Sequence, residues 1–287
     1  MSLTIPLTIA SLSLLALVAA VILYFVAQRF KVFEDPRIDE IQAILPAANC
    51  GGCGFAGCRN FAEALVGAET LDNLNCPVGG AEAMKAAGSI LGKTPPVADP
   101  LIAVLLCNGK PEYRPLTSHY DGISDCRIIN SLYAGESDCS FGCLGSGDCV
   151  RACTFDAIHL DKETRLPVIS DTKCVACGAC VKACPRNLIE LRKKAKKERK
   201  IYVACSSCEK GAIARKACSV ACIACNKCVK ICESGAIRIE NFLAYIDATK
   251  CTFCRKCVTE CPTGSILEIN FPARKQKTEL EAANLNN

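Results

Sequence analysis

Apolar side chains dominate the start of the chain, and no charged side chain occurs before Arg29. The run from Leu3 to Ala27 is longer than the about 20 apolar residues that a helix needs to cross a bilayer. It lacks the basic start and the shorter apolar core of a cleaved signal peptide. The pattern therefore predicts a membrane anchor over residues 1–30.

Positive charges follow the apolar run at Arg29, Lys31 and Arg37. Basic residues beside a membrane span normally stay on the cytoplasmic side. We therefore expect a single-pass protein of the cell (inner) membrane, with its N-terminus outside and everything after Ala27 on the cytoplasmic side. That compartment is reducing, which disfavours structural disulfides.

The pattern after the anchor divides the chain into further parts. "GKTPPVADP" indicates a linker, because proline blocks helix formation and extends the chain. "LIAVLLC", ending at Cys107, and "KIYVAC", ending at Cys205, predict two buried strands that open two similar units. The expected parts are an anchor (1–30), a small module (31–91), a linker (92–100), a first repeat (101–191), a basic connector (192–200), a second repeat (201–271) and a mobile tail (272–287).

Cysteine is the unusual component, with 25 cysteines and only two histidines in 287 residues. So high a content indicates a disulfide scaffold or a metalloprotein, and a cytoplasmic location favours the metalloprotein. The scarcity of histidine disfavours haem and Cys2His2 zinc sites. The formal net charge of +5 counts the thiols as neutral. Iron–sulfur clusters held by thiolates would make the loaded protein acidic, so no nucleic-acid partner is expected.

Two runs, Cys174 to Pro185 and Cys251 to Pro262, have the spacing C-x2-C-x2-C-x3-C-P. In bacterial two-cluster ferredoxins the first three cysteines bind one [4Fe–4S] cluster and the fourth binds the neighbouring cluster. Zinc ribbons use two separated C-x2-C pairs instead. A partner run extends from Cys222 to Cys232. The interleaved pattern predicts site 4, formed by Cys222, Cys225, Cys228 and Cys261, and site 5, formed by Cys232, Cys251, Cys254 and Cys257.

The first repeat has an irregular partner run, in which Ser146 stands where a cysteine is expected. Cys139 lies one helical turn before Cys143 and is the nearest replacement. A three-cysteine [3Fe–4S] site, or a site ligated by Ser146, remains an alternative. The predicted groups are site 2, formed by Cys139, Cys143, Cys149 and Cys184, and site 3, formed by Cys153, Cys174, Cys177 and Cys180.

Two further groups lie outside the ferredoxin runs. "CGGCGFAGC" and a later Cys-Pro pair predict an iron–sulfur site 1, although zinc remains open on spacing alone. The two strand-end thiols suggest a further cluster, site 6, against the alternative of buried free thiols. Cys208 is then left over. The predicted groups are Cys50, Cys53, Cys58 and Cys76 for site 1, and Cys107, Cys126, Cys205 and Cys218 for site 6. The cofactors are therefore five [4Fe–4S] clusters, and six if site 6 is loaded.

The basic run from Arg192 to Lys200 is either a solvated connector or a docking patch for an acidic electron carrier. The docking candidates are Arg192, Lys193, Lys194, Lys196 and Lys197. The sequence contains no nucleotide-binding or haem motif and no nucleophile–base pair. We therefore expect a protein that transfers electrons and has no catalytic substrate site of its own.

The order of these parts, with "CGGCGFAGC" directly after an anchor and "GCLGSGDC" before the ferredoxin runs, resembles the B subunit of the Rnf (Rsx) complex. The two ferredoxin units resemble the long form of that subunit. The resemblance implies an α+β fold with a single transmembrane helix, an iron–sulfur module and two tandem ferredoxin-like repeats, each with two [4Fe–4S] clusters.

The same resemblance implies a subunit of an ion-pumping translocase that accepts electrons from reduced soluble ferredoxin. It would relay them to the membrane subunits of a ferredoxin:NAD oxidoreductase, which are its expected partners. The alternative is a membrane-bound polyferredoxin subunit of a hydrogenase or formate dehydrogenase. A more distant alternative is a zinc-bound structural membrane protein.

Overall fold

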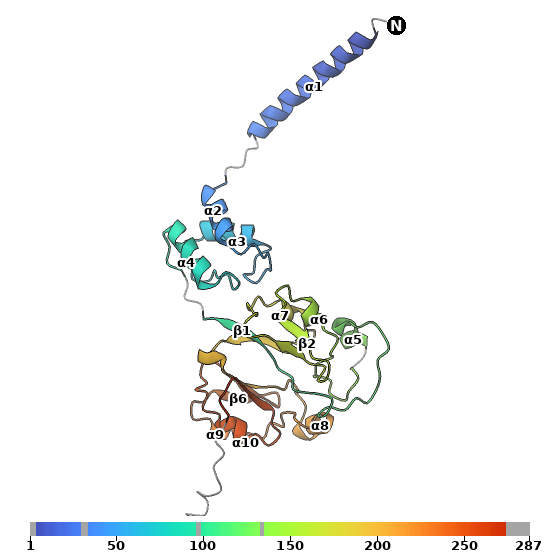
Figure 1. Cartoon of the computed structure of the whole chain (residues 1–287), viewed down its shortest axis with the longest axis vertical. Coiled ribbons are helices and arrows are strands. Elements are labelled where there is room, and N and C mark those ends of the chain that lie inside the picture. The colour runs from blue at the N-terminus through green and yellow to red at the C-terminus, as the bar shows by residue number, and fades with distance from the viewer. Residues whose placement is uncertain (1–3, 30–33, 96–98, 133–134, 274–287) are drawn as a thin grey trace, which may run out of the picture.

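The computed structural model describes residues 4–29, 34–95, 99–132 and 135–273. Helix α1 (Thr4–Arg29) projects away from the rest of the molecule (Figure 1). Its Leu7–Arg29 segment is long and apolar enough to cross a membrane, and its side chains are exposed along the whole length. The ends of the predicted anchor, the middle of the linker (96–98) and most of the predicted tail (274–287) lie outside the described residues.

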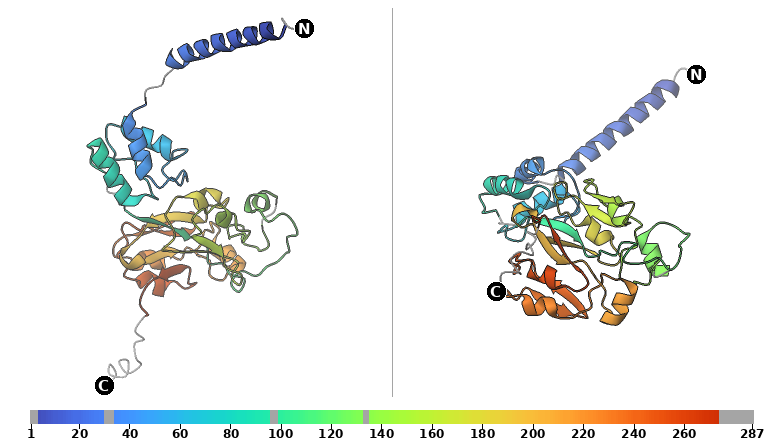
Figure 2. Two further views of the ribbon diagram at one scale, coloured as in Figure 1. Left: turned by 45° about the horizontal axis from the view of Figure 1, so that its top comes forward. Right: turned by 60° about the horizontal axis from the view of Figure 1, so that its bottom comes forward.

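Three short helices form a separate small module below α1 (Figures 1 and 2). They are α2 (Pro36–Ile44), α3 (Cys58–Gly67) and α4 (Gly80–Leu91). Asp35 caps α2 by accepting the Arg37 N–H at 3.0 Å, and Pro36 suits the first position of a helix.

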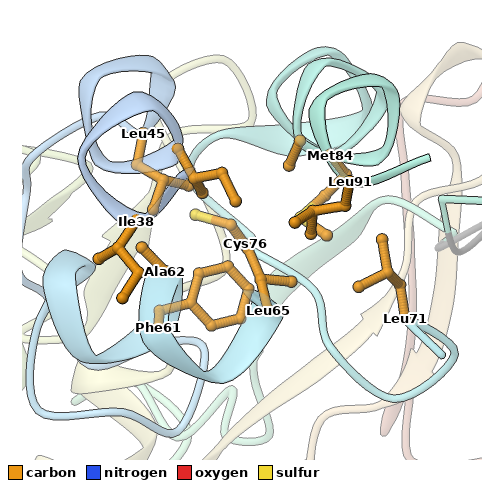
Figure 3. Packing of buried hydrophobic residues seen from close by; sticks show 11 residues of the cluster. Ile38, Leu45, Phe61, Ala62, Leu65, Leu71, Cys76, Met84 and Leu91 are labelled. Atoms are coloured by element: carbon orange, nitrogen blue, oxygen red, sulfur yellow. The ribbon is translucent and has the colours of Figure 1, made fainter. Parts of the chain in front are cut away.

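Each helix of this module turns one apolar face inward, and Ile41, Phe61 and Met84 are completely shielded from solvent. Cys76 lies among these apolar side chains, as Figure 3 shows. The core therefore holds a cysteine that the sequence assigns to site 1. The packing of this core therefore fixes the position of the Cys76 thiol.

The first repeat consists of small antiparallel strand pairs and short helices, as expected for an α+β ferredoxin-like unit. Strand β1 pairs with β4, and β2 pairs with β3. Strand β4 extends into the predicted connector. The elements are β1 (Leu101–Leu105), α5 (Cys126–Leu132), α6 (Asp148–Arg151), β2 (Ile158–Leu160), β3 (Pro167–Ile169), α7 (Ala179–Ala183) and β4 (Ile189–Lys193).

The second repeat has the same plan, because its first strand again pairs with its last and a hairpin lies between them. The predicted strands before Cys107 and Cys205 are the equivalent strands β1 and β5. The elements are the 3-10 turn η1 (Lys196–Glu198), β5 (Lys200–Val203), α8 (Gly211–Ala217), α9 (Lys227–Ile231), β6 (Ile237–Glu240), β7 (Leu243–Ile246), α10 (Lys256–Glu260) and β8 (Ile266–Ile269).

The two repeats share an apolar contact at their first strands. Val104 of β1 packs with Tyr202 and Ala204 at the β5 end, and all three are buried. Two hydrogen bonds join the chain just beyond these strands: Asn108 N–H donates to the Ala204 carbonyl at 3.0 Å, and Ser206 Oγ donates to the Leu106 carbonyl at 2.9 Å. The ends of β1 and β5 are therefore held side by side.

Candidate metal centres

Four cavities in the two repeats are each lined by four cysteines, with empty volumes of about 320 to 420 Å³ that include space open to solvent. Within the described ranges, no three His, Cys, Asp or Glu side chains converge closely enough to hold a single metal ion. The thiols instead surround a space, which is the arrangement that a polynuclear cluster with thiolate ligands requires.

Two of the cavities contain the groups that ferredoxin spacing predicts. The third cysteine of each run lies on a short helix, Cys180 on α7 and Cys228 on α9, and faces the other thiols of its group. The fourth cysteine of each run enters the neighbouring group. The cavity linings include Cys153, Cys174, Cys177 and Cys180 for site 3, and Cys222, Cys225, Cys228 and Cys261 for site 4.

The cysteines of sites 1 and 5 line none of these four cavities, but their proximity follows from the effect of each thiol on the pKa of its neighbours. Burial is the main cause that raises the pKa of Cys257 to about 12, and the contributing thiols are Cys251, Cys254, Cys228 and Cys232. Apart from Cys228, which belongs to site 4, these are the predicted members of site 5.

In the helical module, burial raises the pKa of Cys76, and Cys53 and Cys58 add to the rise. Cys50, the remaining member of site 1, directly precedes the turn that a hydrogen bond from Gly54 N–H to the Gly51 carbonyl closes at 3.1 Å. The helical module therefore gathers three of the predicted site 1 thiols, with the fourth in the adjoining loop.

Site 2 differs from the sequence-based grouping. The cavity that contains Cys143, Cys149 and Cys184 is completed by Cys126, whereas Cys139 does not line it. The pKa of Cys149 is raised to about 11, mainly by burial and then by the neighbouring thiols Cys126 and Cys184. The cavity therefore groups Cys126 with these three cysteines, where the sequence-based grouping has Cys139.

The physical reason is a contact between α5 and α6 that sequence spacing does not reveal. Cys126 N–H donates to Oδ1 of buried Asp148 at 3.0 Å, which anchors the start of α5 beside the α6 helix. Asp125 caps α5 by accepting the N–H groups of Arg127 and Ile128 at 2.8 and 3.1 Å. The sequence signal for a helix that begins at Cys126 was Asp125 directly before it, because aspartate is a preferred N-cap residue.

Ser146 occupies the position of the missing cysteine and contacts the thiol that replaces it. Burial raises the pKa of Cys126, while the backbone N–H and hydroxyl of Ser146 donate to its sulfur and act in the opposite direction. The serine thus lies beside the sulfur of Cys126 as a hydrogen-bond donor.

The remaining cavity lies between the two repeats and contains Cys139 in place of Cys126. Its cysteine lining is Cys107, Cys139, Cys205 and Cys218. Three members of the predicted site 6 therefore line one cavity, and Cys139 stands there in place of Cys126. The loop from Cys139 to Cys143 turns between two cavities, so these neighbouring cysteines serve different groups. Cys208 is exposed and lines none of the four cavities.

Backbone amides face several of these sulfur atoms. The fourth cysteine of each run in the first repeat accepts an N–H from four residues further on: Ala157 N–H lies 3.4 Å from Cys153 Sγ, and Leu188 N–H lies 3.3 Å from Cys184 Sγ. Such donors favour thiolate and tune a cluster's potential. The donor set therefore fits [4Fe–4S] clusters, whose binding must displace the thiol protons.

The basic run is not a uniform docking patch. Arg192 is only 7% exposed, and its Nη2 donates to the Ile246 carbonyl at 2.6 Å. Its guanidinium carbon lies 5.1 Å from the centre of the Tyr245 ring. Arg192 therefore joins the repeats internally, which corrects the prediction that it contacts a partner.

The lysines of the same run differ from one another. Lys193 and Lys194 form ion pairs with acidic neighbours, at 2.5 and 2.7 Å. Lys197 is exposed, and the side chain of Lys196 lies outside the described residues. A docking role for these lysines remains a prediction.

Comparison with known proteins agrees with this geometry. Residues 140–191 and 221–265 each match a family described as a 4Fe-4S dicluster domain, and residues 45–78 match the FeS family of iron–sulfur cluster modules. The fold and the cysteine-lined cavities therefore define an iron–sulfur electron-transfer protein with a candidate membrane-spanning helix.

Three similar proteins identify the family. The chain is 39% identical to the B subunit of the ion-translocating oxidoreductase complex of Methanosarcina acetivorans, over 85% of this chain and 90% of that protein. It is 41% identical to the B subunit of the proton-translocating ferredoxin:NAD(+) oxidoreductase complex of Clostridium ljungdahlii, over 85% and 84%. It is 40% identical to the B subunit of the Na(+)-translocating ferredoxin:NAD(+) oxidoreductase complex of Acetobacterium woodii, over 83% and 70%. The chain belongs to the family of Rnf complex B subunits.

Proposed function

We propose that this subunit accepts electrons from reduced soluble ferredoxin and relays them to membrane subunits of an ion-pumping ferredoxin:NAD oxidoreductase. It acts as the electron-transferring part of a translocase and has no substrate site of its own. The names of the similar subunits support this proposal, since two of them include ferredoxin:NAD(+) oxidoreductase and ion translocation.

The observation that carries the proposal is the contiguity of the cysteine groups. Cys228 of site 4 and Cys257 of site 5 are buried in the same apolar cluster. Cys149 of site 2 packs against the apolar cluster that contains Cys180 of site 3. Neighbouring groups within each repeat therefore lie close together, as electron relay requires.

We assign [4Fe–4S] clusters to five groups, with one change from the sequence-based ligand sets. Sites 1, 3, 4 and 5 keep their predicted cysteines, and site 2 takes Cys126 with Cys143, Cys149 and Cys184. When bound, each cluster supplies a one-electron couple. The protein directs amide N–H groups at the sulfur atoms of Cys153 and Cys184.

Electrons enter at the second repeat. Cys225 of site 4 and Cys254 of site 5 are exposed, whereas the other cysteines of the two repeats' predicted ferredoxin groups are buried or partly buried. Lys227 and Lys250, close to these groups in the sequence, are also exposed. An acidic ferredoxin would be attracted to such a face by long-range electrostatics.

Electrons leave through the module nearest the anchor. Only residues 30–35 separate α1 from α2 in the chain, so the module that holds site 1 stays close to the membrane. The positive charges after α1 support a cytoplasmic location for the module and both repeats.

Rapid mixing of the anaerobically purified protein with reduced ferredoxin tests this function. We expect fast oxidation of ferredoxin, with a rate that falls as salt rises. The double variant Lys227→Gln, Lys250→Gln should slow it by about ten-fold at low salt, within the range of electrostatic steering. Lys85→Gln, an exposed lysine of the helical module, is the matched control. Failure of the wild type to oxidise ferredoxin would contradict the proposal.

A further inference from the structure

We propose that Cys107, Cys139, Cys205 and Cys218 bind a sixth [4Fe–4S] cluster, which connects the two ferredoxin repeats, and that Arg114 is its counter-charge. The proposal rests on the electron-transfer function proposed above. It concerns residues outside the matched family regions, which cover residues 45–78, 140–191 and 221–265.

The first two thiols are positioned by the contact between equivalent strands. Cys107 follows β1 and Cys205 follows β5, and the hydrogen bonds on either side of them cross between the repeats. Asn108 N–H donates to the Ala204 carbonyl at 3.0 Å, and Ser206 Oγ donates to the Leu106 carbonyl at 2.9 Å. A pseudo-twofold pair of strand ends therefore brings one thiol from each repeat to the same cavity.

The other two thiols also come one from each repeat. Cys139 is 9% exposed, and Cys218, at the end of α8, is 6% exposed. The α8 end is tied to the first repeat, because Ser219 N–H donates to the Tyr113 carbonyl at 2.9 Å. All four thiols line one cavity with an empty volume of about 320 Å³, which includes space open to solvent.

Arg114 supplies an independent observation that the cavity is built for an anion. Its side chain lines the cavity, and its Nε is buried without a hydrogen-bond partner in the described part of the chain. Nη2 donates to the Cys143 carbonyl at 2.8 Å, which fixes the guanidinium in place. A buried cation with a free donor is costly unless an opposite charge lies nearby. A cluster with four thiolates is such an anion.

Glycine makes room for this arginine. A side chain at Gly142 would collide with the Arg114 guanidinium, so the loop before Cys143 can pass only because the residue has no Cβ. Gly109 N–H lies 3.4 Å from Cys107 Sγ and adds an amide donor to the same site. The site therefore has four thiols, a cation and an amide donor.

The position of the site gives it a role. Cys143 of site 2 directs its N–H at Cys107 Sγ, 3.5 Å away. On the opposite side, Cys205 packs against the apolar cluster that contains Cys222, a member of site 4, and Ala221 beside Cys222 lines the cavity. The sixth site thus touches one cluster group in each repeat. Electrons arriving at the second repeat would cross to the first repeat through it.

Iron and sulfide counting with an intramolecular transfer assay tests this inference. Six clusters correspond to about 24 irons per chain in the wild type, and Cys205→Ser should lower the count to about 20. Cys208→Ser is the matched control, because Cys208 is exposed and lies outside the cavity. In Cys205→Ser, reduced ferredoxin should still reduce the second repeat, whereas reduction of the first repeat should slow by at least ten-fold.

A second variant keeps all four thiols and tests the counter-charge. Arg114→Met should retain about 24 irons. It should shift the potential of one cluster downward, because a positive charge favours the reduced, more negative state. Arg114→Lys should restore most of that shift. Unchanged potentials in Arg114→Met would overturn the role of Arg114.

The two proposals fail in different ways. A wild-type count of about 20 irons, unchanged in Cys205→Ser, would overturn the sixth cluster and leave the electron-transfer function intact. Protein without acid-labile sulfide would overturn the electron-transfer function itself. The wild-type count decides the first question even if a cysteine variant fails to fold.

Discussion

Gly52 of the helical module packs directly on the backbone of Cys177 in the first ferredoxin repeat. A Cβ atom at Gly52 would lie 3.0 Å from both the Cα and the carbonyl oxygen of Cys177. Burial raises the pKa of Cys177, and Cys50 is among the thiols that raise it further, so site 1 adjoins site 3. The module that holds site 1 therefore contacts a cluster loop of the repeat, and this contact is the expected exit for electrons.

Gly52→Val should weaken this contact, because the added methyl groups have no space against a backbone. Overpacking of this kind costs about 1–3 kcal/mol. A loss of about 1–2 kcal/mol would shift the equilibrium between the docked and the undocked helical module about 5- to 30-fold toward the undocked state. We expect faster proteolysis in residues 92–100 and a weaker magnetic interaction between the reduced clusters of sites 1 and 3 in EPR spectra.

Gly67→Ala is the control for this change. Gly67 is in the same module, has no other atom within 4 Å of its added Cβ and does not adopt a positive φ. Its alanine variant should behave as the wild type. Equal EPR coupling in Gly52→Val and Gly67→Ala would show that the Gly52 contact does not hold the two parts together.

The exchange of Cys126 and Cys139 between sites predicts a pattern of iron loss in double variants. Cys126→Ser and Cys184→Ser affect the same cavity, so the double variant should lose about four irons, as each single variant does. Cys126→Ser with Cys218→Ser affects two cavities and should lose about eight. Iron and sulfide analysis measures both. If the pair of Cys139→Ser and Cys184→Ser loses only about four, the sequence-based grouping is right instead.

Glu136 holds the loop that carries Cys126. Its Oε1 accepts the Tyr120 N–H at 3.1 Å, and its Oε2 accepts a bond from Arg165 at 2.7 Å. Burial alone would raise the pKa of Glu136, but these two donors outweigh it and the pKa is lowered. A carboxyl with a lowered folded-state pKa stabilises the fold above its ordinary value of 4.5, and this is lost as pH falls through the folded-state value.

Glu136→Gln should therefore loosen this loop at neutral pH, with a local cost of about 1–3 kcal/mol. Hydrogen exchange at residues 117–132 should become faster, and the wild type should show the same change only at acidic pH, below about 4.5. Glu163→Gln changes an exposed carboxyl of the same repeat and should have no effect. Protection that is equal in both variants would contradict the role of Glu136.

Arg192→Met should destabilise the junction between the repeats, because it leaves the buried Ile246 carbonyl without its donor. We expect a cost of about 1–3 kcal/mol, measured as a lower melting temperature of the loaded protein. The rate of ferredoxin oxidation at the second repeat should be unchanged. Lys197→Gln, an exposed position, should stay within about 0.5 kcal/mol of the wild type. An unchanged melting temperature with slower ferredoxin oxidation would restore the docking interpretation of Arg192.

Local composition and residue spacing were sufficient to predict part of the structure of this protein. The length and apolarity of α1 follow from composition. The grouping of Cys222, Cys225 and Cys228 in one cavity follows from the two-residue gaps between them, since so short a spacing keeps the three thiols around the same cluster site. The interleaved Cys261 follows from the repeated ferredoxin plan.

Other features depend on contacts between residues far apart in the chain. In sequence Cys139 is the nearest candidate to complete the group of Cys143, but the buried Asp148 brings Cys126 to that cavity instead by anchoring α5. The basic run looks solvated in sequence, yet Arg192 is buried because β4 continues through it and packs against the second repeat.

The sequence by itself thus determined the long apolar helix at the start of the chain and the repeated ferredoxin units. It also determined those cysteine groups whose members are close in the chain, because short spacing restricts the path of the backbone. Only the tertiary structure decided which distant cysteine completes each remaining group, since that depends on how strands β1 and β5 and helices α5 and α6 pack. The cavity shared by Cys107 and Cys205 exists only where the two repeats meet.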